Sequence, residues 1–134
     1  QIWRRSWNIP PPAASKNYIK KFLSNMNYSG ISEDKIPNGE SLRGTYERVI
    51  PFFEKKILPL LKNKKSIIIS AHGNSLRTIF KRLFDISIKN ITKLEVPTGN
   101  PFLISFDKDM KIINYKITWH KSPKYIYIHK WSLI

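Results

Sequence analysis

The chain has 134 residues and a net charge of +15, from 24 lysines and arginines against 9 aspartates and glutamates. Apolar residues make up 41% of it and aromatic residues 13%, which is typical of a folded domain and excludes a wholly disordered chain. No apolar run is long enough to cross a membrane, and the absence of cysteine excludes disulfides and thiolate metal sites. We therefore expect a single domain (residues 1–134) in the cytoplasm.

The positive charge favours anionic partners, whether phosphorylated metabolites, nucleic acid or acidic lipid head groups. Lysine is spread along the whole chain rather than gathered in one block, so the charge does not choose among these ligands. A coding bias toward Lys, Asn and Ile explains the same composition without selection for any ligand.

The chain begins with "QIWRRSWNIPPP" and has no initial methionine, a start so rich in aromatic and cationic residues that we expect a fragment of a longer protein. Arg4 and Arg5 are suited to gripping carboxylate or phosphate oxygens, because each guanidinium can donate two parallel hydrogen bonds. Their neighbours Trp3 and Trp7 also suit a platform on which nucleic-acid bases stack. An arginine pair exposed to solvent without a ligand is the structural alternative.

Residues 10–39 are interpreted as a surface connection with a short helix over residues 18–23. Three successive prolines at its start favour an extended backbone, and the Asn38-Gly39 pair near its end marks a turn.

A long helix is predicted from residue 40 onward, because apolar side chains recur every three or four positions as far as Leu60. Ser41 is a plausible cap at its start. Pro51 and Pro59 each remove an amide donor, so we expect the helix to kink or end near them.

The next segments alternate between strand and helix patterns. Three successive isoleucines predict a buried strand over residues 67–70, and helical spacing resumes over residues 76–84. Residues 94–107 read as two strands around a tight turn, and residues 112–117 read as another strand. This succession predicts an α/β architecture in which at least part of the sheet is parallel.

His72 lies where the predicted strand passes into the following helix. Ligands in open α/β sheets bind beyond the carboxyl ends of strands, beside the free amides of a helix N-terminus. Gly73 lets the backbone pass close to a ligand, and Asn74 or Ser75 can cap the helix. An imidazolium there offers donors and charge to a phosphoryl group in transfer, whereas a histidine satisfied by backbone groups is the structural alternative.

Residues 116–134 form a basic aromatic tail with an unusual mixture of lysine, tryptophan and tyrosine. Its composition suits either a nucleic-acid surface or an edge strand on which lysine prevents pairing. A nucleic-acid-binding basic module is therefore the rival from a different functional class.

Four stretches in the same order resemble the C-terminal half of the cofactor-dependent phosphoglycerate mutases, in the histidine phosphatase superfamily. They are "IWRRSWNIPPP", "GESLRGTYERVIPFFEKKILPLL", "SIIISAHGNSLRTIFKRL" and "LEVPTGNPFLISFD". The resemblance implies an incomplete C-terminal portion of a three-layer α/β/α fold. It also implies interconversion of 3-phosphoglycerate and 2-phosphoglycerate, primed by 2,3-bisphosphoglycerate without a metal, in an enzyme that is a homo-oligomer when intact.

The resemblance assigns site residues as well. His72 matches the second active-site histidine, Arg4 and Arg5 match the pair that holds the substrate's anionic groups, and Gly73 and Asn74 match positions that line the ligand. The family's nucleophilic histidine lies in an Arg-His-Gly motif that this sequence lacks. We therefore expect the missing N-terminal half to supply the phosphohistidine and this chain alone to be inactive. A phosphatase of the same superfamily is the second alternative.

Overall fold

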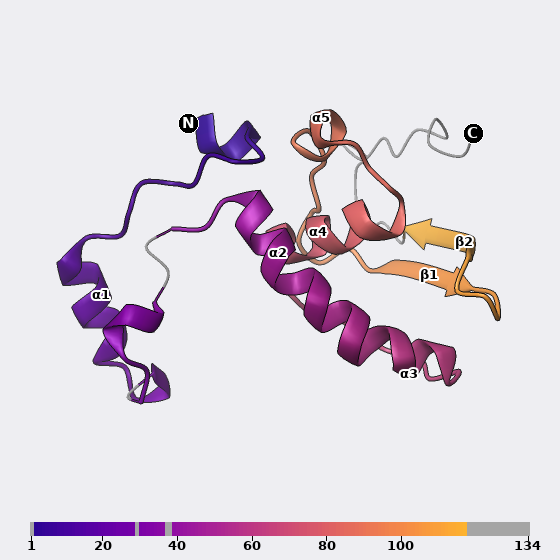
Figure 1. Ribbon diagram of the computed structural model, residues 1–134, viewed down its shortest axis with the longest axis horizontal. Helices are drawn as coiled ribbons and strands as arrows, with labels where there is room; N and C mark the ends of the chain where they lie inside the picture. The colour runs from indigo at the N-terminus through magenta and orange to yellow at the C-terminus, as the bar shows by residue number, and fades with distance from the viewer. Residues whose placement is uncertain (1, 29, 37–38, 118–134) are drawn as a thin grey trace.

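The computed structural model describes residues 2–28, 30–36 and 39–117. In chain order the elements are η1 (Ile2–Arg5), α1 (Lys16–Leu23), η2 (Met26–Tyr28), η3 (Glu33–Lys35), α2 (Leu42–Phe52), η4 (Phe53–Ile57), α3 (Leu58–Lys62), α4 (Gly73–Leu83), α5 (Ile88–Ile91), β1 (Phe102–Phe106) and β2 (Ile112–Ile117). Figure 1 shows α1 standing apart from the body that α2, α3, α4, α5 and the two strands form. Helices and a small sheet are both present, which agrees with the predicted α/β class.

The helices α2 and α3 form one bent rod that is joined by the π-helical turn η4. The side chain of Ser41 accepts a hydrogen bond from the Gly44 amide at 3.1 Å and so caps the start of α2, as predicted. The π-helical turn lies between Pro51 and Pro59, where missing amide donors interrupt the regular ladder. The predicted kink near the prolines is therefore confirmed.

The core lies where α2 and η4 pack against α4, with α5 closing one end. Its buried apolar side chains include Leu42, Ile50 and Phe53 from the first rod, Ile79 and Phe80 from α4, and Ile91 from α5. The helix α5 begins at the cap Ser87 and was not predicted, because a single helical turn carries too little periodicity to detect.

An antiparallel hairpin of β1 and β2 covers the far side of α4. The ring of Phe102 lies 4.7 Å from that of Phe80 and stacks on Tyr115 at 5.8 Å, measured between ring centroids. Phe84 meets Tyr115 edge to face at 5.3 Å. This aromatic cluster attaches the hairpin to the helix, and the strand predicted over residues 112–117 is confirmed.

The strands predicted over residues 67–70 and in the first part of residues 94–107 are wrong. Both segments are without strand pairing, and Ile68 is 96% exposed rather than buried. A strand requires a neighbour to accept its backbone hydrogen bonds, and the described residues provide none for either segment. The only sheet among the described residues is antiparallel, so the expected parallel pairing is not found in this part of the chain.

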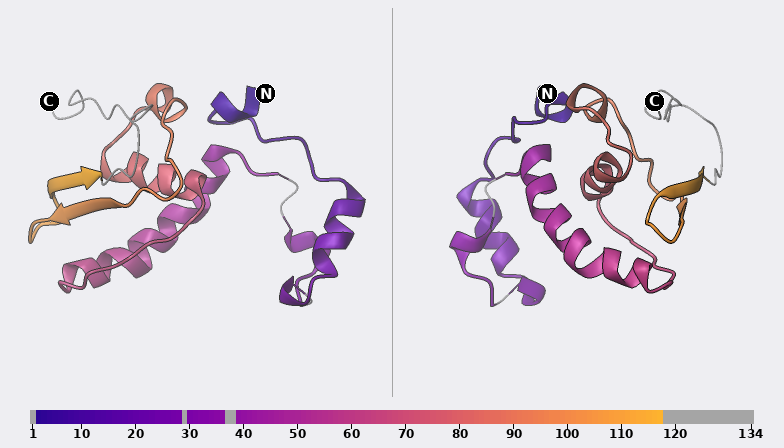
Figure 2. Two further views of the ribbon diagram at one scale, coloured as in Figure 1. Left: turned by 180° about the vertical axis from the view of Figure 1, so that it is seen from behind. Right: turned by 45° about the vertical axis from the view of Figure 1, so that its right-hand side comes forward.

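The connection before α2 contains more helix than expected. The helix α1 begins at Lys16, earlier than the predicted residue 18, because the side chain of Ser15 caps it by accepting from the Tyr18 amide. Figure 2 shows this part of the chain projecting from the body in two further views. The basic aromatic tail lies almost wholly in residues 118–134, outside the described residues.

Trp7 attaches the N-terminal segment to the two principal helices. Its ring meets that of Tyr46 edge to face at 5.6 Å, and the Lys81 ammonium lies 5.5 Å from its centroid. Its carbonyl also accepts the Arg43 amide at 2.9 Å. Since Tyr46 belongs to α2 and Lys81 to α4, Trp7 packs against both helices instead of presenting a free face for a base.

Replacing Trp7 with alanine should lower the free energy of unfolding by about 2 kcal/mol, because a half-buried aromatic contact and a cation–π contact are lost. Urea denaturation measures this. Trp3→Ala is the matched control in the same segment and should cost about 0.5 kcal/mol or less, since Trp3 makes no ring contact among the described residues. Equal losses in the two variants would contradict the anchoring role of Trp7.

Glu40 braces the start of α2 through a two-point ion pair with Arg48, with oxygen to nitrogen distances of 2.8 and 2.9 Å. The Thr45 hydroxyl donates to the same carboxylate at 2.9 Å. The hydrogen bonds from Arg48 are the main cause that lowers the pKa of Glu40 below its ordinary value of 4.5, while partial burial opposes them. The ionised carboxylate therefore stabilises the folded state.

Glu40→Gln should reduce stability by about 1 kcal/mol at neutral pH, a modest loss because Arg48 is largely exposed to solvent. A carboxylate with a lowered pKa contributes its full stability above pH 4.5 and loses it as the pH falls through the folded-state value. Unfolding curves at neutral pH and at successive values below 4.5 should therefore converge for wild type and variant. Glu47→Gln, which breaks the exposed pair with Arg43, is the control, and a loss independent of pH would refute the ionic explanation.

Candidate active site

His72 is the N-cap of α4, a position that the sequence had suggested for Asn74 or Ser75. Its Nδ1 accepts the Asn74 amide at 3.2 Å, so the ring itself satisfies one of the helix's free donors. Because Nδ1 acts as an acceptor, the proton of the neutral ring lies on Nε2. His72 thus keeps one N–H group that can donate to a ligand beside the helix N-terminus.

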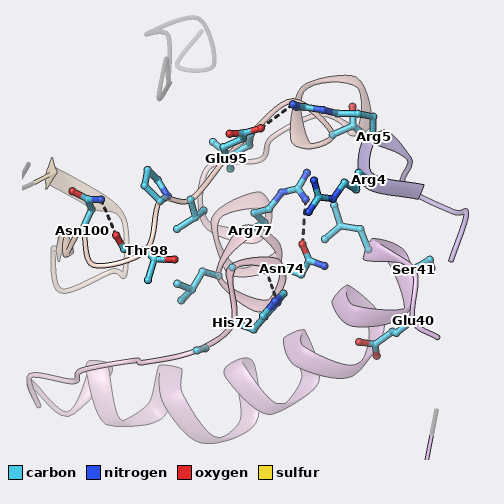
Figure 3. A pocket seen from close by; sticks show the side chains of 18 of the residues that line it. Arg4, Arg5, Glu40, Ser41, His72, Asn74, Arg77, Glu95, Thr98 and Asn100 are labelled. Carbon is cyan, nitrogen blue, oxygen red and sulfur yellow. Dashed lines mark hydrogen bonds and ion pairs between the residues drawn. The ribbon is translucent and has the colours of Figure 1, made fainter. Parts of the chain in front are cut away.

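Arg4 and Arg5 lie on η1, which Trp7 holds against α2 and α4. The guanidinium of Arg5 donates from Nη2 to the Glu95 carboxylate at 2.8 Å, a contact that is half exposed. Figure 3 shows both arginine side chains on the same side of a cavity, with the contact between Arg5 and Glu95 at its rim. The N-terminal segment therefore contributes two permanent positive charges to the cavity wall.

An open cavity of about 1130 Å³ brings together all the site residues chosen from the sequence: Arg4, Arg5, His72, Gly73 and Asn74. Its wall comes from the N-terminal segment, the start of α2, the turn into α4 and the loop before β1. Positive side chains and helix amides thus face one space, a combination suited to binding anions.

The backbone at Gly73 does not require a glycine. A Cβ built there would meet the Val96 carbonyl oxygen at 3.8 Å, an ordinary contact distance. The protein itself would therefore tolerate alanine at this position. What glycine adds is open space on the cavity wall, next to the His72 ring.

Three charged residues of the cavity were not chosen as site residues from the sequence, namely Glu40, Arg77 and Glu95. Arg77 lies three residues after Asn74 on one face of α4, and this spacing was a usable signal. Glu95 falls in a segment that was predicted to be a strand, which hid its place at the cavity rim. Burial first, and the nearby charge of Arg5 second, lower the pKa of Arg77 below its ordinary value, while Glu95 opposes them.

The part of the chain that the structure describes contains no group of three or more His, Asp or Glu side chains able to hold a metal ion. Among the same residues, no helix is both long and apolar enough to cross a membrane. His120 and His129 belong to residues 118–134 and lie outside the described residues.

A family model described as histidine phosphatase superfamily (branch 1) matches residues 15–116. The chain is 46% identical over 110 residues to a 2,3-bisphosphoglycerate-dependent phosphoglycerate mutase of Erythrobacter litoralis, covering 82% of this chain and 47% of the relative. Mutases of the same name from Caulobacter sp. and Pelagibacter ubique are 44% and 46% identical, again over 82% of this chain and over 45% and 46% of each relative.

The chain therefore spans about half the length of the curated relatives that it matches. The match of the family model to most of the chain agrees with the resemblance seen in the sequence motifs. On this basis, the protein belongs to the histidine phosphatase superfamily (branch 1).

Proposed function

We propose that this chain is the C-terminal portion of a 2,3-bisphosphoglycerate-dependent phosphoglycerate mutase, which interconverts 3-phosphoglycerate and 2-phosphoglycerate. The observation that carries the proposal is that Arg4 and Arg5 line the same cavity as His72, which lies at a helix N-terminus. The names and identities of the relatives support the same choice of reaction. The complete enzyme would act in the cytoplasm as a homo-oligomer.

The cavity suits a small molecule with carboxylate and phosphate groups. The guanidinium forks of Arg4 and Arg5 match the planar arrangement of such oxygens, and the first amides of α4 add donors and a partial positive charge. Gly73 leaves room for an oxygen to approach these amides. The remote anionic group of the substrate thus fixes its position while the transferring phosphoryl group lies beside His72.

His72 serves as a donor rather than as the nucleophile. A nucleophilic ring nitrogen must direct its lone pair at phosphorus, and the lone pair of Nδ1 is taken by the Asn74 amide. The remaining nitrogen, Nε2, carries the ring proton and donates a hydrogen bond to a phosphoryl oxygen. This hydrogen bond stabilises the charge that builds up during transfer. The resemblance places the phosphohistidine in an Arg-His-Gly motif that this sequence lacks, and we therefore assign it to the other half of the enzyme.

The priming cofactor, 2,3-bisphosphoglycerate, fits the charges of this cavity. It supplies a phosphoryl group when bound, and the family needs no metal beside it. Arg4 and Arg5 would hold its anionic groups together with the Gly73 amide, since the Asn74 amide already donates to His72. Three arginines line the cavity, Arg4, Arg5 and Arg77, against two carboxylates, Glu40 and Glu95, and Glu40 is in addition paired with Arg48.

A phosphatase of the same superfamily is the second candidate, because the description of the matching family names phosphatases. The two differ in the acceptor of the phosphoryl group, which is water in a phosphatase and the substrate hydroxyl in a mutase. Release of inorganic phosphate without isomerisation would therefore identify a phosphatase. The nucleic-acid-binding alternative rests on the charge and on the basic aromatic tail, which lies almost wholly outside the described residues; the packing of Trp7 against α2 and α4 bears only on the suggested stacking platform.

We expect the 134-residue chain alone to show no mutase turnover and no phosphoryl adduct on histidine after incubation with 2,3-bisphosphoglycerate, because the sequence lacks the Arg-His-Gly motif of the family's nucleophile. Mass spectrometry detects the adduct. A chimera that places the N-terminal part of the Erythrobacter litoralis relative before Gln1 should gain turnover in an enolase-coupled assay. A stoichiometric adduct and turnover in the isolated chain would overturn the incomplete-site proposal.

In that chimera, His72→Ala should lower kcat by about 10²- to 10³-fold with little change in KM, because a donor to developing charge acts mainly on the transition state. Steady-state kinetics separate the two constants. His72→Gln is the matched control, since its amide can still donate a hydrogen bond and should retain part of the activity. A raised KM with unchanged kcat would assign His72 to substrate binding instead.

A further inference from the structure

Arg77 is a charged residue of the cavity wall to which neither the motifs nor the proposed reaction gives a task. It lies on α4, and side chains on a helix lean toward its N-terminus, so the guanidinium returns to the turn that carries Asn74. Figure 3 shows it on the same side of the cavity as Arg4 and Arg5. Its position places it between the arginine pair and the helix start.

The head group of Arg77 makes two fixed contacts. Nη1 donates to Oδ1 of Asn74 at 3.2 Å, and Nη2 donates to the carbonyl oxygen of Ile91 at the end of α5. Because Ile91 is fully buried, the second contact ties the guanidinium to a rigid part of the core. The first contact then holds the Asn74 carboxamide in one orientation, with its oxygen toward Arg77 and its NH₂ group left to donate elsewhere.

Two features of its surroundings oppose the charge of Arg77. The side chain is partly buried beside the like charge of Arg5, and its Nε is buried with no hydrogen-bond partner among the described residues. The charge strengthens the hydrogen bond to the Ile91 carbonyl, and an anion in the cavity would in addition relieve the repulsion between the arginines. Glu95 offsets only part of it, because it is already paired with Arg5.

We infer that Arg77 is a positioning residue for anion binding: it orients the Asn74 carboxamide toward the ligand and adds a third guanidinium charge to the cavity. The inference rests on the proposed function for the identity of the ligand. The positioning role does not depend on the identity of the ligand; it requires only that Arg77 act through its contact with Asn74.

The test is a double-mutant cycle on the full 134-residue chain, with inorganic phosphate and 3-phosphoglycerate as probes in isothermal titration calorimetry. Arg77→Gln should weaken binding by about 30-fold and Arg77→Lys by about tenfold, because lysine keeps the charge but cannot bridge Asn74 and Ile91. In an Asn74→Ala background, Arg77→Lys should cost less than about twofold, since the group that it positions is gone.

Arg82→Gln is the matched control on the same helix, where Arg82 forms a half-exposed pair with Glu54 at 2.7 Å. It should change the affinity by less than about twofold. Circular dichroism melts check that each variant is folded. An Arg77→Lys chain that does not fold would assign Arg77 to the fold and overturn the inference.

The outcomes separate the two proposals. Binding of 3-phosphoglycerate that Arg77→Lys weakens no more than Arg82→Gln would overturn the role of Arg77 and leave the mutase proposal standing. Equal losses from Arg77→Lys with and without Asn74 would also overturn it. Binding of phosphate but not of 3-phosphoglycerate, with the predicted coupling intact, would support the role of Arg77 and reject the mutase proposal. Binding of neither probe would reject both.

Discussion

The candidate site depends on one contact, the packing of Trp7 against α2 and α4. The ring meets Tyr46 of one helix and lies beneath Lys81 of the other, while the carbonyl accepts the Arg43 amide. Arg4 and Arg5 immediately precede this anchor in the chain, and His72 begins the helix that carries Lys81. The distance between the arginine pair and the histidine is therefore set by helix packing, although almost seventy positions separate them in the sequence.

Helix packing, rather than a sheet, organises the described part of the chain. Ser15, Ser41 and Ser87 cap the helices α1, α2 and α5, and their side chains accept hydrogen bonds from free amides of the first turn. The helices α2 and α4 bury a shared apolar face. The isoleucine-rich segment before His72 does not share in this core, and Ile68 is almost fully exposed. The site is thus framed by helices on one side, and this segment forms another part of the cavity wall.

The electrostatics of the cavity follow from how its carboxylates are used. Glu40 is held by Arg48 and Thr45 at the start of α2, and Glu95 is held by Arg5 at the opposite rim. Glu95 offsets the charge of Arg77 only in part, and Arg77 keeps its charge despite partial burial. The cavity accordingly presents an excess of positive charge to a ligand, and the direction of that excess agrees with an acidic, phosphorylated substrate.

The sequence by itself determined the family resemblance and, through its motifs, the choice of Arg4, Arg5, His72, Gly73 and Asn74. It also determined the rod of α2 and α3 with its proline interruption and the strand β2, because periodicity and caps depend on neighbouring residues. It failed at residues 67–70, since an apolar run does not reveal whether a partner strand is present to accept its hydrogen bonds. Only the tertiary structure decided that His72 itself caps α4 and that Arg77 and Glu95 join the cavity. Arg77 and Glu95 owe their places to contacts with Ile91 and Arg5, which lie far from them in sequence, whereas the cap at His72 is a local contact made by a residue type that is not a usual N-cap.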